Sequence, residues 1–227
     1  MSFFTLIISS IRHHWRLHLA VGLGVATATT VLTGALLVGD SVRGSLRDLT
    51  IQRLGRINQI LVADRFFREE ISGEVRAATR FLDHFEAVQP VILVRGSLRN
   101  SNANRLAGNV TVLACDENFW ELGEGGPAKS PVGNQIVLNE QLASSSELSV
   151  RVGDRVMLQI GMRSEVPADS PLGNKQNTID RREFVVSEII PAAGLGRFGL
   201  RPNQQLPNNA FVSRQSLQTM LDVENKV

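Results

Sequence analysis

The feature that most constrains this chain is a charge-free apolar stretch near its N-terminus, residues 19–39, which reads LAVGLGVATATTVLTGALLVG. A helix of this length rises about 30 Å, which matches the hydrocarbon thickness of a lipid bilayer. The polar members of the stretch are all threonines, whose hydroxyls can hydrogen-bond to carbonyls of their own helix. We therefore predict that residues 19–39 form a transmembrane helix in contact with the lipid bilayer.

A cleaved signal peptide is the main alternative for this stretch. The apolar core of a signal peptide usually has about 7–15 residues and a small-x-small cleavage site after it. The stretch here is longer, and no such site precedes Asp40, so we expect the span to be retained. Arg12 and Arg16 before it are balanced by Arg43 and Arg47 after it, which leaves the positive-inside rule undecided. The short N-terminal tail favours a cytoplasmic N-terminus and an extracytoplasmic, periplasmic location for the main domain.

The span and the segment before it each suggest a further contact. Gly22, Gly24 and Ala28 are small residues of the kind that let two transmembrane helices approach closely, and we predict that they face a partner helix. Residues 1–18 repeat apolar side chains every four positions beside arginine and histidine. This pattern is typical of an amphipathic helix lying in the membrane interface; the alternative is the frayed start of the transmembrane helix.

Residues 40–57 continue the helical spacing of apolar residues beyond the span. We predict that they form a helical stalk that leaves the membrane. Its apolar stripe has too little sequence around it for a local core, so we expect it to contact another helix. The stripe consists of Val42, Leu46, Leu49 and Leu54.

Residues 58–227 mix strand and helix patterns without the regular alternation of a doubly wound sheet. The predicted fold class is therefore mixed α+β, with a transmembrane helix and stalk followed by an extracytoplasmic α/β domain. The predicted strands cover residues 59–63, 86–99 (centred on 91–94), 110–114, 135–138, 156–160, 183–190 and 210–212. The predicted helices are a surface helix over 67–82, one capped by Asn139 that runs through Leu148, and one capped by Ser213. A polar loop is predicted over 161–180, and Asp116 is the predicted cap of a short turn.

Little in the sequence indicates catalysis. The GlyxGlyxxGly stretch at 194–199 is followed by Arg201-Pro202 rather than by the helix that a dinucleotide site requires, so we predict a close-packed loop. Cys115 is the only cysteine and the four histidines form no zinc motif. We predict no catalytic, cofactor-binding or metal-binding residue, and take Cys115 as a buried structural thiol. A net charge of only +2 gives no indication of nucleic-acid binding.

Several stretches of the chain resemble the permease subunits of MacB-like and FtsX-like ABC transporters. They are VTVLACDENFW at 110–120, IVLNEQLASSSELSVRVGDRVMLQI at 136–160, FVVSEIIPA at 184–192 and NNAFVSRQSLQTML at 208–221. The resemblance implies a periplasmic core domain of MacB type on residues 58–227, in a protein of the inner (cell) membrane. It also implies an ABC ATPase subunit and a second permease copy as partners. Members of this family have three further spans, so we expect the chain to be a fragment or a truncated relative.

The role implied by this resemblance is mechanical. The partner ATPase would hydrolyse ATP, and the stalk would relay the movement to the periplasmic domain for export or lipoprotein release; the chain itself would not be an enzyme. The alternative is a single-span, membrane-anchored extracytoplasmic domain that binds a partner without transport. A neighbouring ATPase gene would discriminate between the two. A membrane-anchored hydrolase is a third class, for which the sequence offers no nucleophile–base set.

Overall fold

The computed structural model describes residues 3–63, 65–103, 105–161, 179–200 and 205–227. It divides the chain into two compact units, Met1–Leu49 and Thr50–Val227. Most of the polar loop predicted over 161–180 lies outside the described residues.

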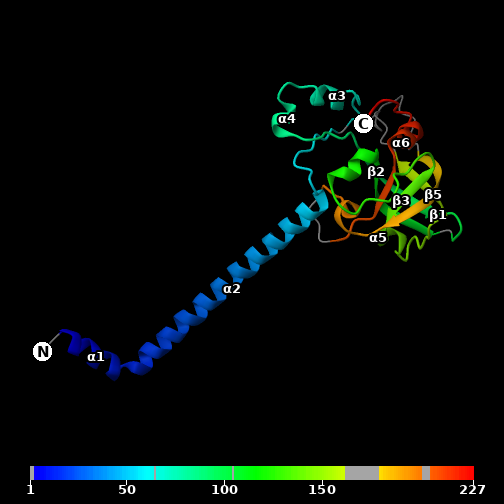
Figure 1. Ribbon diagram of the computed structural model, residues 1–227. Helices are drawn as coiled ribbons and strands as arrows, with labels where there is room; N and C mark the ends of the chain where they lie inside the picture. Colours follow the sequence, from blue (N-terminus) through cyan, green and yellow to red (C-terminus); the bar gives the residue numbers. More distant parts are fainter. Residues whose placement is uncertain (1–2, 64, 104, 162–178, 201–204) are drawn as a thin grey trace, which may run out of the picture. The chain divides into compact units, whose positions relative to one another are not determined.

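The first unit is helical. Helix α1 (Phe3–His13) is separated at His14 from α2 (Trp15–Leu54), a continuous 40-residue helix (Figure 1). Threonine hydroxyls in α2 donate to carbonyls one turn back, for example Thr29 to Val25 at 2.7 Å. This is the bonding expected of hydroxyls in an apolar helix. Within the described residues, α2 is the one helix that is long and apolar enough to cross a membrane, judged by length and composition.

Six strands of the second unit close into a barrel in the order β1-β2-β6-β3-β5-β4 (Figure 1). Two neighbouring pairs are parallel, β2 with β6 and β3 with β5, and the others are antiparallel. Since the sheet closes on itself, it offers no free edge to another strand. The strands are β1 (Ile92–Asn100), β2 (Arg105–Cys115), β3 (Gln135–Asn139), β4 (Arg155–Gly161), β5 (Ile179–Ile190) and β6 (Asn209–Ser213).

Two apolar clusters lie on the two faces of the β2–β6–β3 part of the barrel. Side chains alternate between faces along a strand, so the neighbours Val112 and Leu113 belong to different clusters. The larger cluster contains Leu98, Leu158 and Phe184, all fully buried, and fills the barrel. The smaller cluster lies outside it and contains Leu113, Cys115, Phe119, Val137, Ile190, Leu195, Phe198 and Phe211. Because both faces of β3 and β6 are buried in these clusters, the sequences of the two strands are nearly continuous apolar runs.

Asn139 connects three elements at the end of β3. Its side chain is fully buried, and its Oδ1 accepts from the backbone amides of Leu142 and Asn209, both at 3.1 Å. Its Nδ2 donates to the carbonyls of Pro207 at 2.7 Å and Gly196 at 3.1 Å. The first bond is the predicted helix cap of α5 (Glu140–Ala143). The other three join β3 to the start of β6 and to the 3₁₀ turn η2 (Gly194–Arg197).

Several local predictions are confirmed. Strands β1 and β2 form the expected antiparallel hairpin, with a bulge between Gly96 and Leu98. Ser213 caps α6 (Arg214–Leu221) by accepting from the amide of Ser216. Asp116 does precede a short helix, η1 (Glu117–Leu122), but its side chain makes no cap bond. The carboxylate instead accepts from Arg214.

Two predicted helices are shorter than expected. In place of one helix over 67–82 there are α3 (Ile71–Arg76) and α4 (Phe81–His84). The break between them contains Thr79, a β-branched residue that is a weak helix former. The helix α5 ends at Ala143 rather than at Leu148. Serine side chains compete with the helix after that point; the Ser145 hydroxyl accepts from the amide of Leu148 at 3.2 Å.

The strand predicted at 59–63 is wrong. This segment has no strand partner among the described residues, and Ile60, Leu61 and Val62 are 47, 73 and 67% exposed. Its composition favours a strand locally, but the closed barrel leaves no edge for it to join.

Candidate functional site

The chemical groups singled out by the sequence are not assembled into a reactive centre. In the part of the chain that the structure describes, no group of three or more His, Cys, Asp or Glu could hold a metal ion. Cys115 is buried as predicted, and burial, followed by the neighbouring charge of Asp116, raises the pKa of its thiol to about 12. Such a thiol is not a thiolate nucleophile at neutral pH. The GlyxGlyxxGly stretch forms the single turn η2, which is too short to receive a pyrophosphate at a helix N-terminus.

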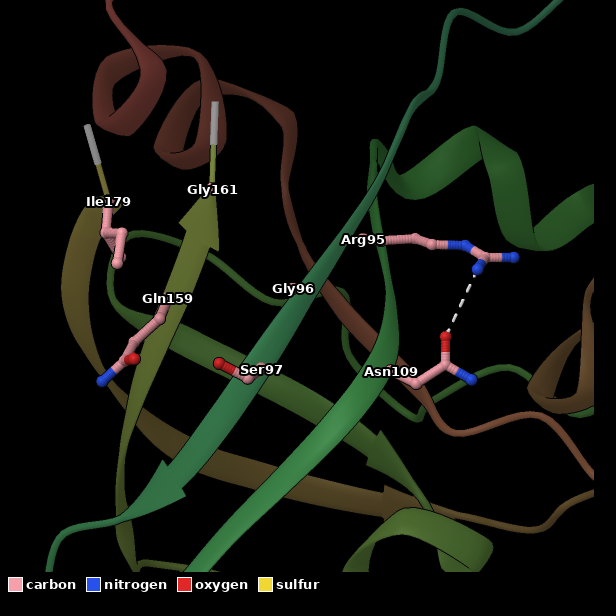
Figure 2. A pocket seen from close by; sticks show the side chains of 7 residues that line it. All are labelled: Arg95, Gly96, Ser97, Asn109, Gln159, Gly161 and Ile179. Atoms are coloured by element: carbon pink, nitrogen blue, oxygen red, sulfur yellow. Dashed lines mark hydrogen bonds between the residues drawn. The ribbon is translucent and has the colours of Figure 1, made fainter. Parts of the chain in front are cut away.

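An open depression of about 520 Å³ lies over strands β1, β2, β4 and β5 (Figure 2). On one side Arg95 donates to the Oδ1 of Asn109 at 3.4 Å. Small-molecule sites are usually concave and mostly apolar, whereas this depression is lined by a single apolar side chain, that of Ile179. The depression is therefore a poor candidate for a small-molecule site. The remaining lining residues are Gly96, Ser97, Gln159 and Gly161.

The last turn of α2 and the three residues after it, Thr50–Ile57, are built into the second unit. Gly55 ends the helix with φ +57°, a left-handed conformation that glycine adopts without strain. The next amide, that of Arg56, donates to the carbonyl of Leu122 at 2.7 Å. A Cβ added at Gly55 would lie 2.6 Å from the same carbonyl oxygen. Glycine is thus required both by the turn and by the close approach of η1.

Apolar contacts hold the same segment in place. Leu54 and Ile57 pack against the smaller apolar cluster beside Trp120 and Leu122. Leu54, which was predicted to belong to the apolar stripe of the stalk, therefore packs inside the second unit. Burying two large aliphatic side chains contributes roughly 3–6 kcal/mol when each is fully covered, and less here because both are half-buried. The helix end is fixed by contacts as well as by chain connectivity.

The other residues predicted to make helix contacts lie in the first unit. No described atom lies within 4 Å of a Cβ built at Gly22 or Gly24, so this surface of α2 is open to close approach. Ala28 is exposed as well, and Val42 is 46% exposed. Leu46 and Leu49 are half-buried. Contacts of these residues with a partner helix remain predictions.

Arg214 is the centre of an ion cluster that the sequence analysis did not find. Its Nε donates to the Oδ2 of Asp116 at 2.9 Å, and its Nη1 pairs with Glu69. Burial alone would lower the pKa of Arg214, but the bonds to Glu69 and Asp116 outweigh it and raise that pKa. The hydrogen bond from Arg214 lowers the pKa of Glu69. Gln218 extends the cluster by donating to Glu69 at 3.1 Å and to the Lys226 carbonyl at 2.8 Å.

This cluster fixes the segment before the barrel against the end of the chain. Phe67 and Val227 exchange two backbone hydrogen bonds, both of 2.9 Å, and the amide of Glu69 donates to the Asn225 carbonyl at 3.0 Å. The acidic partners of Arg214 lie 98 and 145 positions away from it in the sequence, which is why no local motif reveals them.

Comparison with known proteins gives a weak likeness in structure. No family model matches the chain, and no curated protein matches it. Among solved structures, the chain is similar to the periplasmic region of MacB from Actinobacillus actinomycetemcomitans, with a TM-score of 0.43 at 11% identity. The match covers 71% of this chain and 61% of that one, so the chain spans about three fifths of the length of that structure.

Proposed function

We propose that the chain is the membrane-spanning permease component of an ABC transporter, or part of one. In this proposal residues 19–39 cross the cell membrane and the second unit lies outside the cytoplasm. A partner ABC ATPase supplies the energy, and a second permease copy packs against α2. The permease-like stretches of the sequence suggest the class, and the charge-free helix supports the membrane location.

The observation that carries the proposed relay is the fixed end of α2. The same unbroken helix contains the apolar stretch and ends at Leu54, which packs against the smaller apolar cluster. Gly55, directly after it, lies against the Leu122 carbonyl of η1. A helix that ended in a flexible linker could tether a domain but could not transmit a push or a rotation to it. A helix end held by packing, a backbone hydrogen bond and a glycine turn can transmit both.

The test is to soften this connection while leaving the apolar stretch of α2 and the strands of the barrel unchanged. Four residues, Gly-Ser-Gly-Ser, are inserted after Gly55 in the full-length protein of the native host. We expect the variant to insert into the membrane and to co-purify with an ATPase, yet to lose the ability to restore the phenotype of a deletion strain. The matched control carries the same insertion at Asn102, in the exposed turn between β1 and β2.

Full complementation by the variant with the insertion after Gly55 would contradict the relay and leave α2 as a tether. Failure of any ATPase to co-purify with the wild-type protein would contradict the transporter assignment itself. That second result would favour the single-span binding domain.

A further inference from the structure

Two arginine side chains of the second unit have a buried Nε atom without a partner among the described residues. Arg53, in the last turn of α2, is only 4% exposed, and its Nη2 donates to the Gln205 carbonyl at 3.3 Å. Arg197, in η2, is half-buried. The Nε atoms of both are buried and have no hydrogen-bond partner among the described residues. Buried guanidinium groups are normally paired, because an uncompensated buried charge is very unfavourable.

The two guanidinium groups also act on each other. Burial, and after it the positive charge of Arg197, lowers the pKa of Arg53. Leu54, next to Arg53, packs against the smaller apolar cluster, and that cluster contains Leu195, two residues before Arg197. None of the ion pairs formed within the described residues involves Arg53 or Arg197. Two arginines thus lie beside one apolar cluster, and within the described residues no carboxylate pairs with either of them.

We propose that Arg53 and Arg197 form a binding site for a phosphate group, a function beyond the relay proposed above. Each guanidinium offers a planar set of N–H donors that fits a phosphate oxygen pair. A phosphate monoester or inorganic phosphate carries about −1.5 to −2 charges at neutral pH, which neutralises two arginines, whereas one carboxylate would leave a positive charge. The group can come from a soluble phosphate or from a lipid headgroup, and the experiment separates these sources.

The site would make the stability of the helix anchor depend on ligand. Arg53 precedes Leu54 and Gly55, the residues that fix the end of α2. A bound phosphate would relieve the repulsion between the two arginines and stabilise the folded second unit in proportion to the logarithm of its concentration. The ligand would therefore stiffen the connection without touching the membrane-spanning residues 19–39 of α2.

The experiment measures thermal unfolding of the full chain in phosphatidylcholine nanodiscs, with inorganic phosphate titrated against sodium chloride at constant ionic strength. Trp120 fluorescence reports the second unit in a Trp15→Phe background. At a hundredfold excess of phosphate over Kd, we expect Tm to rise by roughly 5–10 °C above the chloride control. Arg53→Gln and Arg197→Gln should each lose this rise. Arg56→Gln, which alters an exposed arginine one turn away, should keep it.

A second arm uses nanodiscs that contain phosphatidic acid, whose headgroup is a phosphate monoester, and no added phosphate. A Tm rise that depends on Arg197 there assigns the lipid headgroup as the source; a rise with inorganic phosphate alone assigns a soluble one. Equilibrium dialysis of phosphate against the wild-type chain, with one phosphate bound per chain expected, serves as a readout that does not require the variants to fold. The proposal is overturned if phosphate gives no more stabilisation than chloride, if Arg197→Gln responds like the wild type, or if dialysis finds no bound phosphate.

Discussion

Replacing Asn139 by alanine should strongly destabilise the barrel. The amide side chain makes four hydrogen bonds inside the protein, two as donor and two as acceptor, and is fully buried. Alanine removes all four and leaves the carbonyls of Gly196 and Pro207 and the amides of Leu142 and Asn209 without this partner. At about 1 kcal/mol for each bond, the free energy of unfolding should fall by about 4 kcal/mol.

The assay is urea unfolding of the full chain in detergent, followed by the fluorescence of Trp120 in a Trp15→Phe background. Both tryptophans of the chain are thereby accounted for, and the signal comes from the second unit. A loss of about 4 kcal/mol corresponds to a fall in Tm of roughly 8–16 °C for a unit of this size. The matched control is Asn134→Ala, an exposed asparagine directly before the same strand, which should change stability by less than about 0.5 kcal/mol.

Asn139→Asp tests the same reasoning through pH. The introduced carboxylate would face the carbonyls of Gly196 and Pro207 in a buried site, which raises its pKa in the folded state above the ordinary value of about 3.9. Its penalty should therefore be small near pH 4 and grow as the pH rises. An alanine variant within about 1 kcal/mol of the wild type, or an aspartate variant with no such pH trend, would refute the role given to this side chain.

Three further outcomes are expected. Arg214→Gln should reduce the free energy of unfolding by about 2 kcal/mol at pH 7. Because Arg214 lowers the folded-state pKa of Glu69, this loss should shrink as the pH falls below about 4. A difference in urea midpoint between variant and wild type that does not change with pH would contradict this. Asn102→Cys should react with a membrane-impermeant maleimide in intact cells, whereas the buried Cys115 should not react. Labelling only after lysis would reverse the predicted orientation. Gly24→Leu should lower dimer crosslinking through α2 without affecting membrane insertion, because bulk separates closely packed helices; unchanged crosslinking would remove that contact.

Local patterns in the sequence predicted the local parts of this fold. Alternating or continuous apolar residues identified all six barrel strands, because burial of a strand face depends on residues two positions apart. Asn139 and Ser213 were identifiable as helix caps, since a cap needs only a suitable side chain three residues before the amide it accepts from. The long helix was equally evident from its lack of charges.

What the sequence did not predict depends on partners far away in the chain. The segment 59–63 has strand composition, but a strand also needs a free edge, and barrel closure removes it. The pairing of Arg214 with Asp116 and Glu69 and the approach of Arg53 to Gln205 join residues between 98 and 152 positions apart. The helical pattern predicts a stalk through residue 57, so the sequence did not indicate the positive φ of Gly55. The end of α2 before this glycine is explained only by the contact with Leu122.

The place of β6 in the barrel affects how the protein can be synthesised. This strand lies between β2 and β3, although it is the last strand to leave the ribosome. Until it arrives, the other five strands can form only an open sheet, with β2 and β3 as its edges. At 5–20 residues per second, the 23 residues from Ile190 to Ser213 take roughly 1–5 s. During that interval two apolar strands present unpaired backbone groups to any neighbouring nascent chain, so barrel closure is also the step that ends the period of greatest aggregation risk.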